Sequence, residues 1–430
     1  MRVLFTTWAW PSHYFPMVPV AWALRAAGHE VRMASQPDLL PTMRASGLPV
    51  TAIGRDVDVA AVYRTAADYL RNTEPGEPGP GRRDRVSNYL ADSVTADMEA
   101  GYQTLRGFED EAMSMFRAIW AQRTALQPDR LSLYGEVADA IVDELLRLAR
   151  SWKADLIVYD PLTYAGPLVA KLLGIPAVRN LFGPDVTYFI KVTGWNALLE
   201  RYEVSELDLL GAATIDPCPS ALQFPDSVAP TRRLRTQYVP YNGIAEVPSW
   251  LPDQPGRKRI CLTWGTSIHR LLGDQAFLPA EVLNGCAKLA EERDAELVVA
   301  ITANQRHLLP PVPPNVRVLE SVPLNSLLPT CDAMIHQGGA GTMLTGLRHG
   351  LPQIVLPQLF DEAANAFQIM ATGAGQMHAA VGLSAADILA AGHELLDNPG
   401  YRAGAHKLRD EIHALPTPAA IVRDLEGLVG

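Results

Sequence analysis

The sequence of 430 residues predicts an α/β protein built from two doubly wound, Rossmann-like domains of parallel strands. Three observations predict this fold. Residues 3–7, 19–27 and 31–34 have the patterns of a strand, a helix and a strand, and a unit of this length requires parallel strands joined by a right-handed crossover. A second series of this kind starts at residue 259. Between the two series, residues 213–257 are rich in proline and poor in periodic apolar runs.

The remaining elements follow the same alternation. In the first half we expect helices at 137–152 and 166–173 and strands at 155–159 and 177–181. In the second half we expect strands at 259–263, 296–301, 316–319, 333–336 and 353–356, with helices at 280–293 and 342–349. The predicted organisation is a first domain at 1–212, a Pro-rich interdomain connector at 213–257, a second domain at 258–412 and a C-terminal helix at 413–430 that returns to the first domain.

Composition excludes several classes of protein. Hydrophobic residues make up 48% of the chain and charged residues 20%, which is typical of a globular protein with a large core. A formal charge of −10 argues against a nucleic-acid partner, which needs a concentrated basic surface. The four cysteines are scattered, which argues against a disulfide framework or a zinc site. The chain has neither a signal-peptide pattern nor a long apolar run, so it is expected to be cytoplasmic and free of the membrane.

The strongest local signal is the sequence IHQGGAGT at 335–342. We expect a strand to end at His336, glycines to form a tight turn, and a helix to begin at Thr342. Unpaired backbone N–H groups at a helix start bind anions, and glycines let the backbone approach a diphosphate closely. The pattern is neither the P-loop of NTPases nor the dinucleotide fingerprint. The plainer alternative is a tight turn capped by Thr342 with no ligand.

Polar residues follow other strands of the second half. Thr266 and Ser267 come directly after the first of these strands, where small hydroxyls hold phosphate oxygens in many α/β proteins. Helix N-capping is the alternative for them. Asp361 and Glu362 follow the last predicted strand, and they either accept hydrogen bonds from sugar hydroxyls or form the acidic first turn of a helix. Neither a D-x-D motif nor a cluster with metal-ligand spacing stands out.

In the first half, His13 lies in the loop after the first strand and Asp160 ends another parallel strand. Both side chains are therefore expected at the same edge of the sheet. A carboxylate beside an imidazole fixes its tautomer and stabilises its protonated form, so the pair is a candidate general base. The alternatives are a surface histidine and a turn-forming aspartate before Pro161.

These residues occur within longer stretches that together resemble a known family. The stretches include MRVLFTTWAWPSHYFPMVPVAWALRAAGHEV, ADLIVYDPLTYAG, LTWGTS, SVPLNSLLPTCDAMIHQGGAGT and HGLPQIVLPQLFDEAANA. They resemble the family 1 glycosyltransferases of the GT-B fold, and within them the bacterial deoxysugar transferases of macrolide and other polyketide antibiotic pathways. The resemblance covers nearly the whole chain. It implies two Rossmann-like domains that face each other across a cleft.

The resemblance also assigns roles to residues. It implies that His13 is the catalytic base and that Asp160 pairs with it. It implies that the backbone near Val322 reads the nucleotide base and that Asp361 and Glu362 contact the donor sugar, although many relatives have Gln in place of Glu362. It implies a diphosphate-binding segment formed by His336, Gly339, Gly341 and Thr342, with help from Thr266 and Ser267.

We therefore expect inverting, metal-independent transfer of a deoxysugar from a dTDP-sugar to an apolar polyketide-type aglycone, without a cofactor. Some relatives need a helper protein resembling a cytochrome P450, and residues 55–135 could serve that contact or acceptor binding. The oligomeric state, a homodimer included, stays open. The alternatives are a nucleotide-sugar epimerase of the same architecture and a non-catalytic sugar-nucleotide binder.

Overall fold

The computed structural model describes residues 1–59, 61, 133–185, 196–205, 207–223, 231–251, 256–274, 277–379 and 382–430. Most of the segment 55–135, for which acceptor or helper contacts were predicted, lies outside the described residues. Residues 186–195 also lie outside the described residues.

The first domain is built on a sheet whose described strands are all parallel, in the order β3-β2-β1-β4-β5-β6-β7. The predicted alternation of strands and helices is confirmed here. The strands are β1 (Arg2–Thr6), β2 (Glu30–Ser35), β3 (Val50–Ala52), β4 (Leu156–Tyr159), β5 (Ala177–Asn180), β6 (Ala213–Asp216) and β7 (Arg233–Arg235), and the helices are α1 (Pro11–Tyr14), α2 (Val18–Ala26), α3 (Leu40–Arg44), α7 (Leu133–Trp152), α8 (Ala165–Leu173) and α9 (Asn196–Arg201).

The second domain has a parallel sheet in the order β10-β9-β8-β11-β12-β13. Its strands are β8 (Arg259–Thr263), β9 (Glu296–Ile301), β10 (Val316–Glu320), β11 (Ala333–His336), β12 (Gln353–Val355) and β13 (Gly375–Met377). Its helices are α10 (Ser267–Leu272), α11 (Ala280–Glu292), α12 (Leu324–Leu327), α13 (Ala340–Arg348), α14 (Phe360–Ala371), α15 (Ala385–Asp397) and α16 (Pro399–Ala414), and a last helix, α17 (Val422–Glu426), follows.

In both sheets the early strands lie on one side of the first strand and the later strands lie on its other side. β1 lies between β2 and β4, and β8 lies between β9 and β11. The strand order therefore changes direction between β1 and β4 and again between β8 and β11. At such a switch point the loops on either side diverge, which leaves a crevice beyond the carboxyl ends of the strands where ligands bind.

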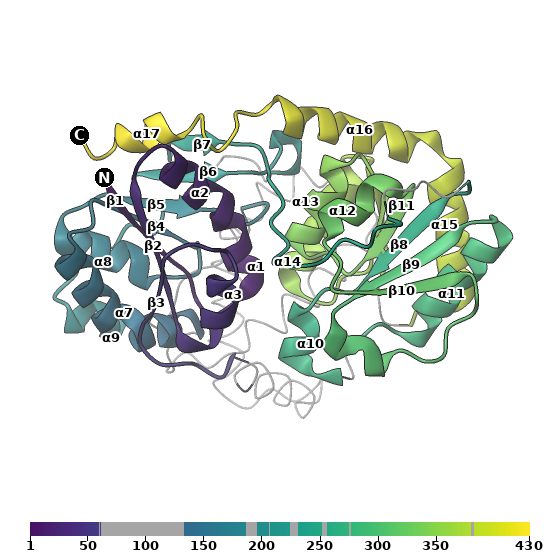
Figure 1. Cartoon of the computed structure of the whole chain (residues 1–430), viewed down its shortest axis with the longest axis horizontal. Coiled ribbons are helices and arrows are strands. Elements are labelled where there is room, and N and C mark those ends of the chain that lie inside the picture. The colour runs from purple at the N-terminus through teal and green to yellow at the C-terminus, as the bar shows by residue number, and fades with distance from the viewer. Residues whose placement is uncertain are drawn as a thin grey trace, which may run out of the picture.

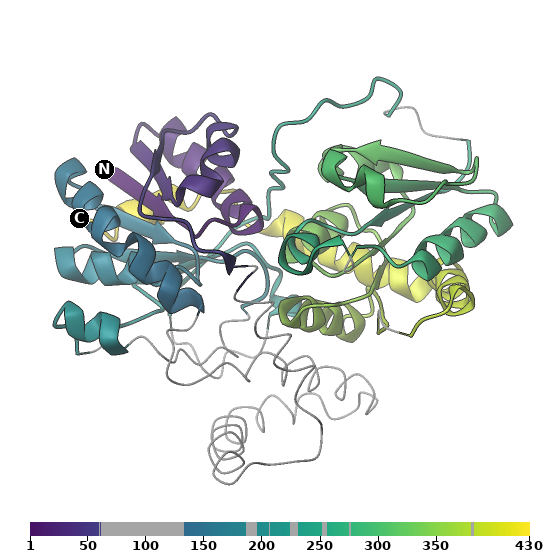
Figure 2. The ribbon, with the colours of Figure 1, turned by 90° about the horizontal axis from the view of Figure 1, so that it is seen from below.

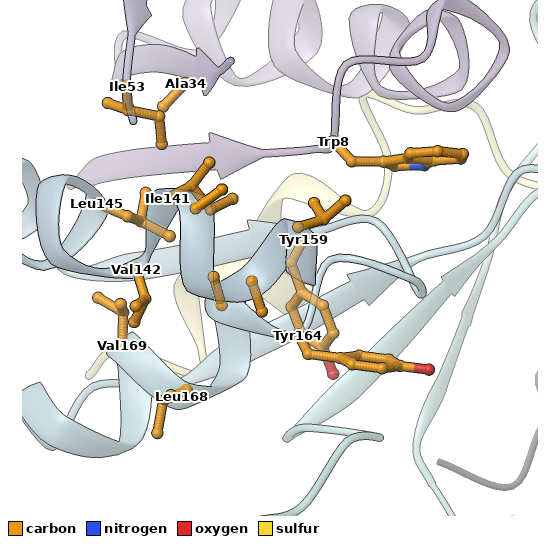
Figure 3. Close-up of a cluster of buried hydrophobic side chains, with 14 of the residues drawn as sticks. Trp8, Ala34, Ile53, Ile141, Val142, Leu145, Tyr159, Tyr164, Leu168 and Val169 are labelled. Atoms are coloured by element: carbon orange, nitrogen blue, oxygen red, sulfur yellow. The ribbon is translucent and has the colours of Figure 1, made fainter. Parts of the chain in front are cut away.

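Alternating strand residues build two cores on the two faces of the first sheet. Leu4 and Ile157 belong to one core with residues of α7 and α8, of which Figure 3 labels Ile141, Leu145 and Leu168. Val3 and Val158 belong to the other core, with residues of α2. Both faces are thus covered by helices, as a parallel sheet requires. The two domains lie side by side in Figure 1, and Figure 2 shows the same pair from below.

The connector is shorter than the sequence predicts. Two segments of 213–257, β6 and β7, pair with the first sheet, so the first domain extends to Arg235 and the crossing lies between β7 and β8. The sequence pattern did not predict these strands because prolines flank both of them: Pro217 and Pro219 follow β6, and Pro230 precedes β7. Proline is tolerated at strand ends, where no ladder hydrogen bond is lost.

The C-terminal segment differs from a single helix at 413–430. α16 runs along the second domain, and the separate helix α17 lies on the first domain beside the amino-terminal strand (Figure 1). Val422 and Leu425 of α17 are buried in the core that contains Val3, and Arg232 pairs with Asp424. None of the described helices is long and apolar enough to span a lipid bilayer.

Replacing Leu425 with Ala tests this docking. The side chain is 0% exposed, so its truncation leaves a cavity and should lower the free energy of unfolding of the first domain by about 2–5 kcal/mol. The measurement is urea denaturation followed by circular dichroism. The control is Val429→Ala at a site that is 37% exposed, where a change within about 0.5 kcal/mol is expected. Equal effects of the two substitutions would contradict the docking.

Candidate active site

The loops after the first strand of each domain contact each other. The indole N–H of Trp10, in the loop after β1, donates to the Ser267 hydroxyl at the start of α10 over 3.1 Å. The guanidinium of Arg270 lies 4.6 Å from the centre of the Trp10 ring and pairs with Asp38 of the first domain. These contacts join the carboxyl-end edges of the two sheets. The loop that leads to His13 and the segment that carries Thr266 and Ser267 therefore lie next to each other, one from each domain.

His13 and Asp160 form a buried pair. The Nδ1 atom of His13 lies 2.7 Å from an Asp160 carboxylate oxygen, and Asp160 is 0% exposed. The other carboxylate oxygen accepts the backbone N–H of Leu162 at 2.9 Å and the hydroxyl of Thr163 at 3.3 Å. Because the carboxylate accepts at Nδ1, the proton of neutral His13 resides there and Nε2 keeps its lone pair. The pair has the geometry of an oriented general base.

Adjacent parallel strands bring these two residues together. β1 and β4 are paired in register, with Thr6 opposite Tyr159, and the backbone N–H of Asp160 donates to the Thr6 carbonyl. Beyond β1 the chain turns into α1, which has Pro11 at its start, a position that proline suits. His13 follows within this single turn and so faces back over the end of β4.

Aromatic rings hold the imidazole of His13 in place. Its centre lies 5.0 Å from that of Trp8, edge to face, and 4.2 Å from that of Phe182. The next residue, Gly183, packs against Ala340 at the start of α13, where an added Cβ would lie 2.6 Å from the Ala340 Cβ. Only glycine permits this approach. Phe182 and Gly183 therefore connect the His13 imidazole, through direct contacts, with the start of α13.

The start of α13 has the features of an anion site. The helix begins at Ala340, two residues earlier than the predicted start at Thr342, so Thr342 lies in its first turn. The residue before the helix, Gly339, provides no capping side chain, which leaves the first backbone N–H groups for a ligand. Gly338 has φ +107°, a conformation that side-chain-bearing residues rarely adopt. Tyr238 of the connector donates to the carbonyl of Gly341 at 3.1 Å and so braces the first turn.

His336 lies buried beneath the glycine turn. Its ring is 0% exposed, Nε2 lies 2.7 Å from the side-chain oxygen of Gln353, and Nδ1 accepts the backbone N–H of Gly338. Burial lowers its pKa to about 4, against a smaller opposing effect of the Gln353 hydrogen bond. The imidazole is therefore neutral at pH 7 and both its nitrogens are engaged. In this structure His336 shapes the glycine turn and has no free nitrogen for a phosphate.

Glu362 lies buried in the first turn of α14. It is 1% exposed, and one carboxylate oxygen accepts the backbone N–H groups of Gln358 and Leu359 at 3.0 and 2.9 Å, which caps α14. Burial, together with the nearby charge of Asp361, raises the pKa of Glu362 to about 8. The alternative of an acidic first helical turn is thus the observed one for Glu362. Asp361 beside it is only partly buried.

The remaining predicted residues lie at the carboxyl edge of the second sheet. Thr266 is exposed directly before α10, and Ser267 is the first residue of that helix. Val322 follows β10 and packs partly against the core beside Trp250. Among the described residues, no group of three or more His, Cys, Asp and Glu side chains has a metal-binding arrangement.

Sequence reasoning missed several residues that support these groups. Gln353 holds His336, the Asn365 amide donates to the Gly338 carbonyl at 2.8 Å, and Phe182 packs on His13. Asn365 had a visible signal, since it lies one helical turn after Asp361 in the stretch DEAANA. Phe182 and Gln353 had none, because each reaches its partner only through the pairing of strands.

Replacing Glu362 with Gln should stabilise the protein increasingly as the pH rises from about 4.5 to about 8. In the unfolded chain this carboxyl ionises near 4.5, whereas in the folded protein it keeps its proton up to about 8. The folded state thus binds more protons in this window, so wild-type stability falls with rising pH, and an amide removes that loss while still capping α14. Thermal melting at several pH values measures it, with Glu246→Gln at an exposed site as the control. If the melting temperatures of wild type and Glu362→Gln changed in the same way with pH, a buried, protonated carboxyl at Glu362 would be contradicted.

Comparisons with known proteins agree with this architecture. The family model for the erythromycin biosynthesis protein CIII-like N-terminal domain matches residues 22–265, and the model for the C-terminal domain of the same family matches residues 282–428. The chain is 37% identical to a 10-deoxymethynolide desosaminyltransferase of Streptomyces venezuelae, over 100% of this chain and 97% of that protein.

Two solved structures are similar throughout. The spinosyn forosaminyltransferase SpnP has a TM-score of 0.74 at 30% identity, covering 100% of this chain and 99% of that one. The spinosyn rhamnosyltransferase SpnG, complexed with thymidine diphosphate, has a TM-score of 0.71 at 30% identity, covering 99% and 100%. The chain therefore belongs to the erythromycin biosynthesis protein CIII-like family and is a GT-B glycosyltransferase of the branch that contains the deoxysugar transferases of antibiotic biosynthesis.

Proposed function

We propose that this enzyme transfers a deoxysugar from a dTDP-sugar to a hydroxyl of a polyketide aglycone, with inversion at the anomeric carbon and without a metal ion. The observation that carries the proposal is the oriented His13–Asp160 pair near the uncapped start of α13. Phe182 contacts the imidazole, and the next residue, Gly183, contacts the start of the helix. One group accepts a proton, and the other favours a developing negative charge. This is the arrangement that direct displacement needs.

In the proposed reaction the Nε2 atom of His13 takes the proton of the acceptor hydroxyl as its oxygen attacks the anomeric carbon. Asp160 stabilises the imidazolium that forms, and its two further hydrogen bonds keep it in place. The bond between the anomeric carbon and the diphosphate oxygen breaks on the opposite face of the sugar. The oxygen attacks from the side opposite to the leaving group, so the configuration inverts.

The leaving dTDP gains negative charge as that bond breaks. Backbone N–H groups at the start of α13, together with the helix dipole, offset this charge in a partly buried site. Thr266 and Ser267 follow β8, the strand that pairs with β11 before α13, and in the proposal they provide hydroxyls for the phosphates. His336 contributes by fixing the Gly338 backbone rather than by its own charge. Fixed N–H donors of this kind make a metal ion unnecessary in the proposal.

The comparisons support the choice of substrates. The similar SpnG structure is a complex with thymidine diphosphate, and the names of the similar enzymes specify desosamine, forosamine and rhamnose as transferred sugars. The name of the desosaminyltransferase specifies 10-deoxymethynolide as its acceptor. An epimerase or a non-catalytic binder is not favoured, because the similar proteins are transferases. Cytoplasmic location, a helper protein and a homodimer stay predictions.

Replacing His13 with Ala should lower kcat by about 10²–10⁴-fold, which is the usual contribution of general-base catalysis. Binding of dTDP should be retained, because His13 belongs to the first domain. Transfer assays and calorimetric titration with dTDP measure the two quantities. The control is His29→Ala, since His29 pairs with Glu426 at the far end of the first domain. Normal turnover by the His13 variant would refute the assignment.

A single reaction in excess EDTA tests the absence of a metal and the inversion together. The rate should equal that without EDTA, because the leaving group is stabilised by backbone N–H groups. Proton NMR of the product should show the anomeric configuration opposite to that of the donor. Activity that disappears and returns with Mg²⁺ would overturn the metal-free proposal, and retained configuration would overturn direct displacement.

A further inference from the structure

We infer that the indole N–H of Trp8 donates a hydrogen bond to a carbonyl oxygen of the acceptor, close to the hydroxyl that His13 deprotonates. The inference rests on the proposed function and deepens it. It names a residue that positions the acceptor and a chemical group that the acceptor must carry.

The Trp8 N–H is a buried donor without a partner. The side chain is 5% exposed, and its Nε1 atom has no hydrogen-bond partner among the described residues. Three other described indoles have partners: Trp10 donates to Ser267, Trp22 to the Ser46 carbonyl and Trp264 to Gln358. A buried donor that loses water and gains no partner destabilises the fold. Such a group, on a ring that contacts the proposed base, is explained when a ligand supplies the missing acceptor.

The position of the indole ring is fixed relative to the catalytic pair. Its ring stacks on Trp10 with an angle of 6° between the planes and meets His13 edge to face. The backbone N–H of Trp8 donates at 3.0 Å to the hydroxyl of Thr163, which itself donates to Asp160. One chain of hydrogen bonds thus sets the positions of Trp8 and Asp160. A molecule held by the indole is therefore placed with respect to the base.

The indole ring of Trp8 lies beyond the carboxyl end of β1, beside two tyrosines. Figure 3 shows Trp8 extending beyond the end of β1 and Tyr164 extending in the same direction, with the indole nitrogen on the side of the ring turned toward Tyr164 in this view. Tyr134 lies between them, with ring centres 6.1 Å from Trp8 and 5.9 Å from Tyr164. These rings offer an apolar surface to the acceptor, while the indole N–H of Trp8 offers a hydrogen-bond donor with a fixed direction.

The chemistry of the two groups defines what the acceptor must offer. An indole N–H only donates, so its partner is an oxygen with a free lone pair. The reacting hydroxyl donates its proton to His13. The centres of the two rings are 5.0 Å apart, so the two oxygens belong to neighbouring positions of one molecule. Polyketides carry hydroxyls and carbonyls on alternate carbons, which meets this requirement.

A spectroscopic experiment reads the hydrogen bond directly. Protein with ¹⁵N-labelled tryptophan gives indole N–H signals from the eight tryptophans of the chain, and the signal missing in Trp8→Phe belongs to Trp8. Adding 10-deoxymethynolide should move that signal downfield, as formation of a hydrogen bond does. The Trp22 signal, assigned with Trp22→Phe, should stay in place. A Trp8 signal that does not move with bound aglycone would overturn the inference.

Kinetics provide the second readout. Trp8→Phe keeps an aromatic ring and deletes the N–H, so kcat/KM for 10-deoxymethynolide should fall about tenfold, the effect of one hydrogen bond. For the analogue with a methylene in place of the carbonyl nearest to the glycosylated hydroxyl, wild type should already show that loss and the variant should add none. The control, Trp22→Phe, should match wild type with both substrates.

The outcomes separate this inference from the proposed function. Transfer that is equally impaired by Trp8→Phe with both substrates, or unaffected with both, overturns the inference alone. A shifted Trp8 signal without any sugar transfer contradicts the proposed function alone. Failure of the aglycone to bind contradicts both, since both require an oxygenated polyketide acceptor.

Discussion

The buried hydrogen bond between His13 and Asp160 is the constraint on which the first half of the site depends. It joins the ends of two adjacent parallel strands, β1 and β4, at the point where the strand order reverses. The carboxylate is held by Leu162 and Thr163, and the imidazole is held by Trp8 and Phe182. The lone pair of the His13 Nε2 atom therefore points in one fixed direction. A base whose orientation is fixed before the acceptor arrives loses little entropy when it reacts.

The second half of the site is built on neutral groups. His336 is buried and uncharged at pH 7, and Glu362 keeps its proton up to about pH 8, because burial disfavours the charged form of each. Both side chains instead bond to backbone: His336 to Gly338, and Glu362 to Gln358 and Leu359. In the proposed reaction, positive potential at this side comes from oriented backbone N–H groups, which remain fixed when charge develops on the leaving group. Aligned peptide dipoles at a glycine turn thus replace cationic side chains.

Sequence patterns predicted the parts of the fold that depend on local chemistry. Apolar runs that end in a polar residue located His13 and Asp160, and the glycines at 338–341 located the turn before α13. Strand pairing was harder to foresee. β6 and β7 are only a few residues long and lie among prolines, so their membership of the first sheet depends on neighbours far away in the chain. The partner of His336 is Gln353 because β11 and β12 pair in a particular register, which no local pattern encodes. The contact between Trp10 and Ser267 spans 257 positions and exists only once both domains have folded.

The most direct test of the account is a crystal structure of the enzyme with bound dTDP. We expect diphosphate oxygens within about 2.7–3.2 Å of backbone N–H groups at the start of α13, with the terminal phosphate on the side of the helix that faces His13. The ring of His336 should remain hydrogen-bonded to Gln353 and Gly338. A diphosphate bound elsewhere, or one separated from the imidazole by the body of a domain, would contradict the arrangement of base and helix end across one cleft.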